Sequence, residues 1–236
     1  IHKANNKFSL YPNYVFEKLK VGDLLNIGFR DLLIKIKKIE KKIIMAKVIR
    51  SGYLENNKGV HLENRKLKLN FLTDKDFRSI KIAEKLKIKH FALSFTNSHE
   101  DVIKFNKLLK NKVKIFKLES KSALKNLDKI LKVGKKFLID RGDLSKEIST
   151  EMIPIAQRKI NLLAKRKKKD IYVATNFLES MLKNNYPTRG EVNDIYNTLE
   201  LGSKGVVLAA ETAIGKFPIN SVKFLKKIIK IFNKYN

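Results

Sequence analysis

Lys117, Glu119 and Asp143 are the residues of this chain whose types and spacing point most directly to chemistry. Lys117 and Glu119 are two positions apart in an apolar run typical of a β-strand, so their side chains share one face. Asp143 follows the next such run. Two carboxylates from neighbouring strands suit a hard cation such as Mg²⁺, which takes one or two carboxylates plus water or substrate oxygens. A lysine beside that cation would hold a phosphoryl group or stabilise an oxyanion.

Polar residues also end the other apolar runs, among them Ser94, Arg141, Thr175 and Glu211. If the strands are parallel and close into a barrel, these carboxyl ends meet at one mouth, where barrel enzymes build their active sites. The alternative is that the charged residues only form ion pairs on a solvated rim. Spacing alone leaves both interpretations open.

Short apolar runs that alternate with amphipathic helical patterns predict the strands that position these residues. Strands are expected at 90–95, 113–119, 136–140, 170–175 and 205–209. Such units bury their strands either in an open doubly wound sheet or in an eight-stranded (β/α)8 barrel.

The helices between the strands carry their own start and stop signals. Ser98 and Ser120 stand at expected N-caps, and Thr188 with Glu191 predicts a capping box. Gly202 stands where the end of that last helix is expected.

The N-terminal part of the chain has a different pattern. Residues 1–66 contain short β-like runs at 24–27, 32–36 and 43–49, separated by glycines. We therefore expect a small β-rich domain over 1–66 and a β/α domain over 67–236.

The net charge of +29 raises the question of nucleic-acid binding. Only eight of the 52 basic residues are arginine, and the lysines are scattered along the whole chain. Base and phosphate recognition favours the arginine fork, so the charge does not favour nucleic acid as a partner. A basic RNA-binding module stays the weakest alternative.

The chain contains no cysteine. This excludes disulfides, thiolate metal sites and a cysteine nucleophile, and it fits a reducing compartment. No apolar run approaches the ~18 residues of a membrane span, and the first residues lack the apolar core of a signal peptide. We expect a cytoplasmic protein without a membrane partner.

Five segments resemble, in order and spacing, the successive signature segments of the pyruvate kinase family. One such segment is weak evidence, whereas five in register are strong. They are Phe-Lys-Leu-Glu-Ser (116–120), Arg-Gly-Asp-Leu-Ser-Lys-Glu-Ile (141–148), Ala-Thr-Asn-Phe-Leu-Glu-Ser-Met (174–181), Pro-Thr-Arg-Gly-Glu-Val-Asn-Asp (187–194) and Glu-Thr-Ala-Ile-Gly-Lys-Phe-Pro (211–218).

The resemblance implies part of a TIM-type (β/α)8 barrel, of which this chain carries strands four to eight, with the N-terminal β domain as a lid. It implies a glycolytic transferase that moves a phosphoryl group from phosphoenolpyruvate to ADP, giving pyruvate and ATP. Mg²⁺ or Mn²⁺ is the implied cofactor. A homo-oligomer is implied for the complete protein.

Position by position, the resemblance assigns roles to five residues. Lys117 matches the lysine that stabilises the transferring phosphoryl group, and Glu119 and Asp143 match the metal ligands. Thr175 matches the threonine that binds the substrate carboxylate and takes part in protonating the enolpyruvate. Gly142 and Asp143 would offer backbone N–H groups to that carboxylate.

Departures from the family pattern accompany the matches. Asn97 stands in place of an arginine, Ser120 in place of an asparagine, and Asp140 in place of a small residue beside the substrate carboxylate. A negative charge at Asp140 should repel an anionic substrate. Residues 28–30 of the lid replace an Asp-Asp-Gly turn. The family's first three barrel strands, with its K⁺ ligands, and its C-terminal domain have no counterpart here, so K⁺ is expected only from the family.

Two functional interpretations therefore stand beside the basic module. The first is a pyruvate kinase, as a fragment or a divergent member. The second is a divergent Mg²⁺-binding barrel that acts on another enol or keto acid or is inactive, because fold alone does not determine function.

Overall fold

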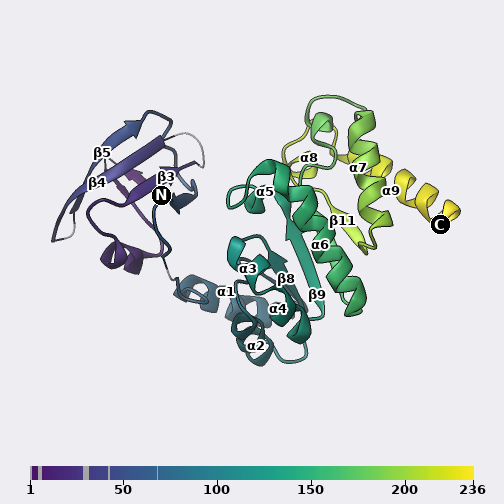
Figure 1. Ribbon diagram of the computed structural model, residues 1–236, viewed down its shortest axis with the longest axis horizontal. Coiled ribbons are helices and arrows are strands. Elements are labelled where there is room, and N and C mark those ends of the chain that lie inside the picture. The colour runs from purple at the N-terminus through teal and green to yellow at the C-terminus, as the bar shows by residue number, and fades with distance from the viewer. Residues whose placement is uncertain (1, 5–6, 29–31, 42, 68) are drawn as a thin grey trace. The chain divides into compact units, whose positions relative to one another are not determined.

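The computed structural model describes residues 2–4, 7–28, 32–41, 43–67 and 69–236. The chain divides into two units, Ile1–Ala83 and Glu84–Asn236, which we describe separately (Figure 1). The domain boundary predicted after residue 66 stays a prediction. Of the lid turn at 28–30, Phe29 and Arg30 lie outside the described residues.

A four-stranded antiparallel sheet forms the first unit, in the order β5-β4-β3-β6. Its strands are β3 (Leu24–Ile27), β4 (Leu32–Glu40), β5 (Ile43–Arg50) and β6 (Val60–Leu62). β4 is longer than predicted, because its pairing with β5 continues to Glu40 beyond the last buried position.

Alternate residues of β3 and β4 make the core of this sheet. Leu25, Ile27, Ile34 and Ile36 are buried, as a period of two requires when one face is covered. Further elements of the unit are β1 (His2–Ala4), β2 (Lys7–Ser9), η1 (Asn13–Lys18) and α1 (Asp74–Lys85), which reaches past the unit's last residue.

The Asp23–Arg65 ion pair ties together the start and end of the small sheet. Arg65 donates from Nε and Nη2 to the two carboxylate oxygens of Asp23, each over 2.7 Å, and Asp23 is buried. Burial acts to raise the pKa of Asp23, but the hydrogen bonds and charge of Arg65 together with the Lys20 N–H outweigh it, so this pKa lies below its usual value.

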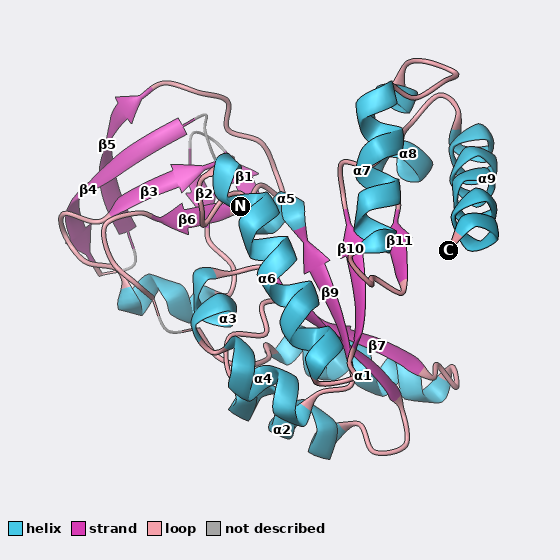
Figure 2. Cartoon of the chain, turned by 45° about the vertical axis from the view of Figure 1, so that its right-hand side comes forward, coloured by secondary structure: helices cyan, strands magenta, loops and turns pink. Residues whose placement is uncertain are grey.

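The second unit is fully described, and its sheet has five parallel strands in the order β11-β10-β9-β8-β7 (Figure 2). Each strand lies beside the next one in the chain, as in consecutive units of a barrel. This confirms the predicted α/β class, a partial (β/α)8 barrel with a small N-terminal β sheet. The strands are β7 (His90–Leu93), β8 (Val113–Leu118), β9 (Lys136–Asp140), β10 (Asp170–Ala174) and β11 (Gly205–Val207).

Helices connect these strands, and α6 contacts β10. The main helices are α2 (His99–Leu108), α3 (Lys121–Lys125), α4 (Leu127–Val133), α6 (Ile153–Arg166), α7 (Arg189–Glu200) and α9 (Pro218–Tyr235), with the short α5 (Arg141–Leu144), α8 (Ala210–Ala213), η2 (Thr150–Met152) and η3 (Glu179–Leu182) between them. Among the residues that the structure describes, no helix is long and apolar enough to cross a bilayer.

The predicted helix signals are confirmed. Ser98 and Thr188 each form a capping box, with Asp101 and Glu191 as the reciprocal acids, and Ser120 caps α3. Each cap satisfies a backbone N–H that the first helical turn leaves unpaired. These caps fix where the helices begin after the strand ends.

Phe116 and Phe137 lie at the centre of the parallel sheet and are fully buried. Their rings are 5.9 Å apart, and Phe105 of α2 packs against Phe116 at 6.0 Å. Ile139 on β9 and Val173 on β10 are also fully buried. The apolar core thus holds β8, β9 and β10 in register, and their carboxyl ends meet at one edge.

Candidate functional site

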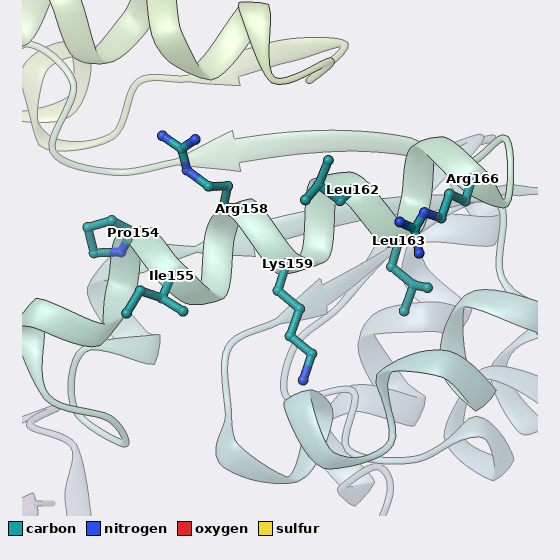
Figure 3. A pocket seen from close by; sticks show the side chains of 7 residues that line it. All are labelled: Pro154, Ile155, Arg158, Lys159, Leu162, Leu163 and Arg166. Atoms are coloured by element: carbon teal, nitrogen blue, oxygen red, sulfur yellow. The ribbon is translucent and has the colours of Figure 1, made fainter.

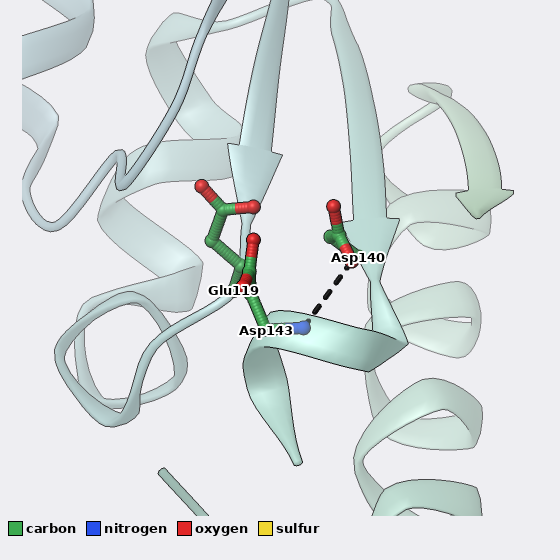
Figure 4. A group of neighbouring side chains, drawn as sticks. All are labelled: Glu119, Asp140 and Asp143. Atoms are coloured by element: carbon green, nitrogen blue, oxygen red, sulfur yellow. Dashed lines mark hydrogen bonds between the residues drawn. The ribbon is translucent and has the colours of Figure 1, made fainter. Parts of the chain in front are cut away.

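The carboxyl ends of β8 and β9 bring four charged residues to one edge of the sheet. Lys117 lies in β8, and Glu119 comes directly after that strand. Asp140 is the last residue of β9, and Asp143 lies in α5, the single helical turn that follows. Glu119, Asp140 and Asp143 face a common space (Figure 4).

Lys117 is held between two carboxylates. Its Nζ lies 2.8 Å from Glu119 Oε2 and 2.9 Å from Asp140 Oδ2. Burial acts to lower the pKa of Lys117, but the close ion pairs with these two acids outweigh it and hold this pKa above its usual value. Lys117 is therefore a protonated side chain with a defined orientation at the strand ends.

Glu119 is completely buried, with a side-chain exposure of 0%. Its Oε1 accepts a hydrogen bond of 2.6 Å from the Phe95 N–H. Oε2 has no aligned hydrogen bond from any described residue, and only the ion pair with Lys117 compensates it. Burial and the charge of Asp140 raise the pKa of Glu119, against Lys117 and the Phe95 N–H. A further cation near Oε2 would relieve this desolvation.

Three carboxylates can meet at one cation. Glu119, Asp140 and Asp143 each offer an oxygen, and these oxygens lie within 4.8 Å of one another. Asp143 Oδ1 also bonds to Lys146 Nζ over 2.6 Å. Carboxylate oxygens are the ligands that Mg²⁺ and Mn²⁺ prefer. The donor set and the buried oxygen of Glu119 thus fit a hard divalent cation.

Thr175, directly after β10, contacts the turn that follows β9. Its Oγ1 accepts a hydrogen bond of 2.9 Å from the Gly142 N–H, and its own hydroxyl donates to the Ala174 carbonyl. A Cβ added at Gly142 would stand 3.5 Å from both Thr175 Oγ1 and Asp140 Oδ1. Gly142 therefore lies between the hydroxyl and the carboxylate cluster without a side chain of its own.

The backbone of Thr175 is unusual. Its φ is +77°, a value that a β-branched residue rarely adopts. Arg141 holds this turn, since it donates to the Thr175 carbonyl and to Asp194 Oδ2, and its guanidinium lies 4.1 Å from the Phe177 ring centroid. Strain of this kind persists where surrounding contacts fix it, and it is common at functional sites.

A comparison with known proteins identifies the family to which this arrangement belongs. Residues 2–222 match the family model described as pyruvate kinase, barrel domain. This chain belongs to the pyruvate kinase family. The match begins in the first unit and runs into α9, so it includes every residue of the strand-end site.

Curated pyruvate kinases from distant organisms are similar to this chain. That of Thermotoga maritima is 35% identical over 216 residues, which is 90% of this chain and 46% of the relative. That of Methanocaldococcus jannaschii is 33% identical over 94% of this chain and 51% of the relative, and that of Buchnera aphidicola 36% over 90% and 46%. The chain spans about half the length of the curated relatives it matches.

The residues to which the pyruvate kinase resemblance assigns roles lie close to one another in the structure. Lys117, Glu119 and Asp143 lie together at the ends of β8 and β9, and Thr175 and Gly142 are hydrogen-bonded to each other. The roles assigned to them stay predictions. The N–H groups expected to hold a substrate carboxylate already have partners, Thr175 for Gly142 and Asp140 for Asp143.

Asp140 is the member of the cluster that the sequence did not predict as a partner of Lys117 and the other two acids. We expected its charge only to repel an anionic substrate, yet it bonds to Lys117 and shares the cation cluster. The strand register explains this contact. Lys117 of β8 pairs with Leu138 of β9, so Glu119 and Asp140 lie opposite each other two positions later. Without knowledge of the register, that juxtaposition could not be read from spacing.

Two other departures from the family pattern contact each other. The Ser120 hydroxyl donates to Asn97 Oδ1, and the Asn97 carbonyl accepts a hydrogen bond of 2.8 Å from Asn126 Nδ2. Ser120 also caps α3 through the Ala123 N–H. The Ser120 hydroxyl, next to Glu119 in the chain, thus has both an acceptor and a donor partner.

A shallow hollow on α6 lies apart from the strand-end residues (Figure 3). Ile155 and Leu162 supply its apolar lining, and Arg158, Lys159 and Arg166 surround them. All of these residues belong to one helix, and none is an acid or a nucleophile. The hollow does not contribute to the candidate site.

Proposed function

We propose that the protein containing this chain transfers a phosphoryl group from phosphoenolpyruvate to ADP, giving pyruvate and ATP. The observation that carries the proposal is the buried Lys117–Glu119 pair beside Asp143, at the strand edge where a barrel enzyme carries its chemistry. Family membership supports the same reaction.

In this proposal Glu119 and Asp143 hold Mg²⁺ or Mn²⁺. When bound, the ion supplies positive charge against the phosphoryl oxygens. The buried carboxylate of Glu119 is fixed by the Phe95 N–H, which orients it without neutralising it. Asp143 is oriented by Lys146 and by its place in the first turn after β9.

Lys117 stabilises the phosphoryl group during transfer. In phosphoryl transfer the charge spreads over the phosphoryl oxygens, so a fixed ammonium acts mainly on the transition state. Its two carboxylate partners keep Lys117 protonated and aimed at the strand edge. The Lys117 side chain is thus already ordered when the substrate binds, so little further conformational entropy is lost in the reaction.

Thr175 acts at the other end of the substrate. Its hydroxyl binds the carboxylate of phosphoenolpyruvate and relays a proton to the enolpyruvate carbon, which becomes the methyl group of pyruvate. A proton from water then restores the hydroxyl. Gly142 and Asp143 support the carboxylate through their N–H groups, which requires that their present bonds to Thr175 and Asp140 open. A K⁺ requirement, a homo-oligomer and a cytoplasmic location complete the proposal, on family grounds and on the lack of cysteine.

Pyruvate formation by the complete protein tests the proposal. Pyruvate released from phosphoenolpyruvate and ADP would be followed in a coupled assay, with the wild type compared with Glu119→Gln. We expect metal-dependent turnover in the wild type and a loss of at least about a hundredfold in the variant. Turnover that is absent, or equal in both proteins, would contradict the proposal.

One observation favours a second candidate, a divergent barrel that acts on another enol or keto acid. Asp140 brings a carboxylate to Lys117, where the family pattern has a small residue. A less anionic substrate would tolerate that charge better than phosphoenolpyruvate does. Screening the complete protein against keto acids for metal-dependent proton exchange at carbon would distinguish the candidates.

A further inference from the structure

Asp140 is fixed in position by two contacts at once. Its Oδ1 accepts a hydrogen bond of 3.3 Å from the Asp143 N–H, which makes Asp140 the N-cap of α5. Its Oδ2 lies 2.9 Å from Lys117 Nζ, and the side chain is 13% exposed. The carboxylate therefore has one defined orientation, toward the space that Glu119 and Asp143 also face (Figure 4).

The charges around this space favour a cation. Three carboxylates meet there, and two ammonium groups touch them, Lys117 on Glu119 and Asp140, and Lys146 on Asp143. The balance is one negative charge in excess in a mostly buried place. Each carboxylate oxygen has two acceptor sites, so a bond to an ammonium leaves capacity for a metal.

Oε2 of Glu119 is a buried carboxylate oxygen that contacts the Lys117 ammonium. Oε2 is buried and receives no aligned hydrogen bond from the described residues, although Lys117 Nζ lies 2.8 Å away. A carboxylate oxygen can accept two contacts, so Oε2 keeps capacity for an ion beside the ammonium. Asp140 and Asp143 each bring a carboxylate oxygen within 4.8 Å of an oxygen of Glu119.

We propose that Asp140 is a third carboxylate ligand of the divalent cation, so that this chain binds the ion without help from substrate oxygens. The inference rests on the proposed function, because it takes Glu119 and Asp143 as the other two ligands. A third carboxylate raises the charge and the number of protein oxygens at the ion, which are the quantities that set affinity in oxygen-ligated sites.

Binding of Mn²⁺ alone tests this, because it needs neither substrate nor turnover. The free ion would be measured by electron spin resonance with the complete protein. Asp140→Asn keeps the shape of the side chain and an oxygen to cap α5, and it removes the charge. We expect its Kd for Mn²⁺ to rise by about tenfold or more. Asp140→Ser, which can also cap the helix, guards against misfolding of the first variant and should show the same rise.

Asp128→Asn is the matched control. It removes one carboxylate from the same unit, on an exposed side chain paired with Lys132 and Lys167. We expect its Kd to stay within about twofold of the wild type. An equal rise in this control would mean that Asp140 acts only through overall charge, and it would overturn the inference.

The Glu119→Gln variant distinguishes a failure of this inference from a failure of the proposed function on which it rests. If Glu119→Gln weakens Mn²⁺ binding and the Asp140 variants do not, Asp140 is only a counter-ion for Lys117. The inference then fails and the proposed cation site stands. If none of the variants changes Mn²⁺ binding, the cation site itself is wrong, and the proposed function loses its main support.

Discussion

The Gly142 N–H donates a hydrogen bond of 2.9 Å to Thr175 Oγ1, and this bond joins the turn after β9 to the end of β10. The two residues are 33 positions apart in the chain and come together because β9 and β10 pair in parallel register. The Thr175 hydroxyl is therefore held against the turn that carries Asp140 and Asp143, two members of the carboxylate cluster.

Thr175→Ala should lower kcat for pyruvate formation by about a hundredfold or more, because the hydroxyl is the group proposed to pass the proton. Thr175→Ser keeps the hydroxyl and should stay within about tenfold of the wild type. Both variants should be measured in steady state with the complete protein. A serine variant as poor as the alanine variant would assign the effect to the methyl group and its packing instead.

Asp23→Asn should lower the melting temperature of the first unit by several degrees at pH 7. The pKa of Asp23 lies below its usual value, so its ion pair with Arg65 stabilises the folded state above the pKa of the unfolded chain. That contribution is lost as the pH falls from about 4 through the lower folded pKa. Thermal unfolding at a series of pH values should show the wild type converging on the variant in acid. A gap that stays constant with pH would contradict the assignment.

Gly134→Ala should destabilise the second unit by about 1–3 kcal/mol. A Cβ at this position would clash with Phe137 Cζ and stand 3.2 Å from Phe116 Cδ2, in the core of the sheet. Gly190→Ala is the control, since its nearest neighbour would be Thr188 Oγ1 at 3.9 Å. Denaturant unfolding of both variants checks this, and equal stabilities would show that the two rings can move aside.

Much of the parallel sheet follows from local sequence. β9 begins and ends at the predicted residues, and the other strands begin as predicted, because each apolar run is short and flanked by polar residues. The ends are less regular: β7 stops at Leu93 rather than at residue 95, where Phe95 takes a φ of +50° and its N–H turns to Glu119. That turn depends on a partner 24 residues away, which local patterns do not contain.

The candidate site, like the sheet, could be predicted only in part from local sequence. Lys117 and Glu119 could be placed together from the period of a strand, and Asp143 from the next strand end. The positions of Asp140 and Arg141 could not, because they depend on strand register and on a contact with Asp194 of α7. Sequence therefore predicts which side chains share a face, while pairing between strands decides which of them touch.

The kinetics of Lys117→Met test the central claim most directly. Lys117 is proposed to act on the transferring phosphoryl group more than on bound substrate, so the variant of the complete protein should lose about 10³-fold or more in kcat. KM for phosphoenolpyruvate should change far less. A variant with an unchanged kcat and a raised KM would contradict the account, because it would show that Lys117 only holds the substrate.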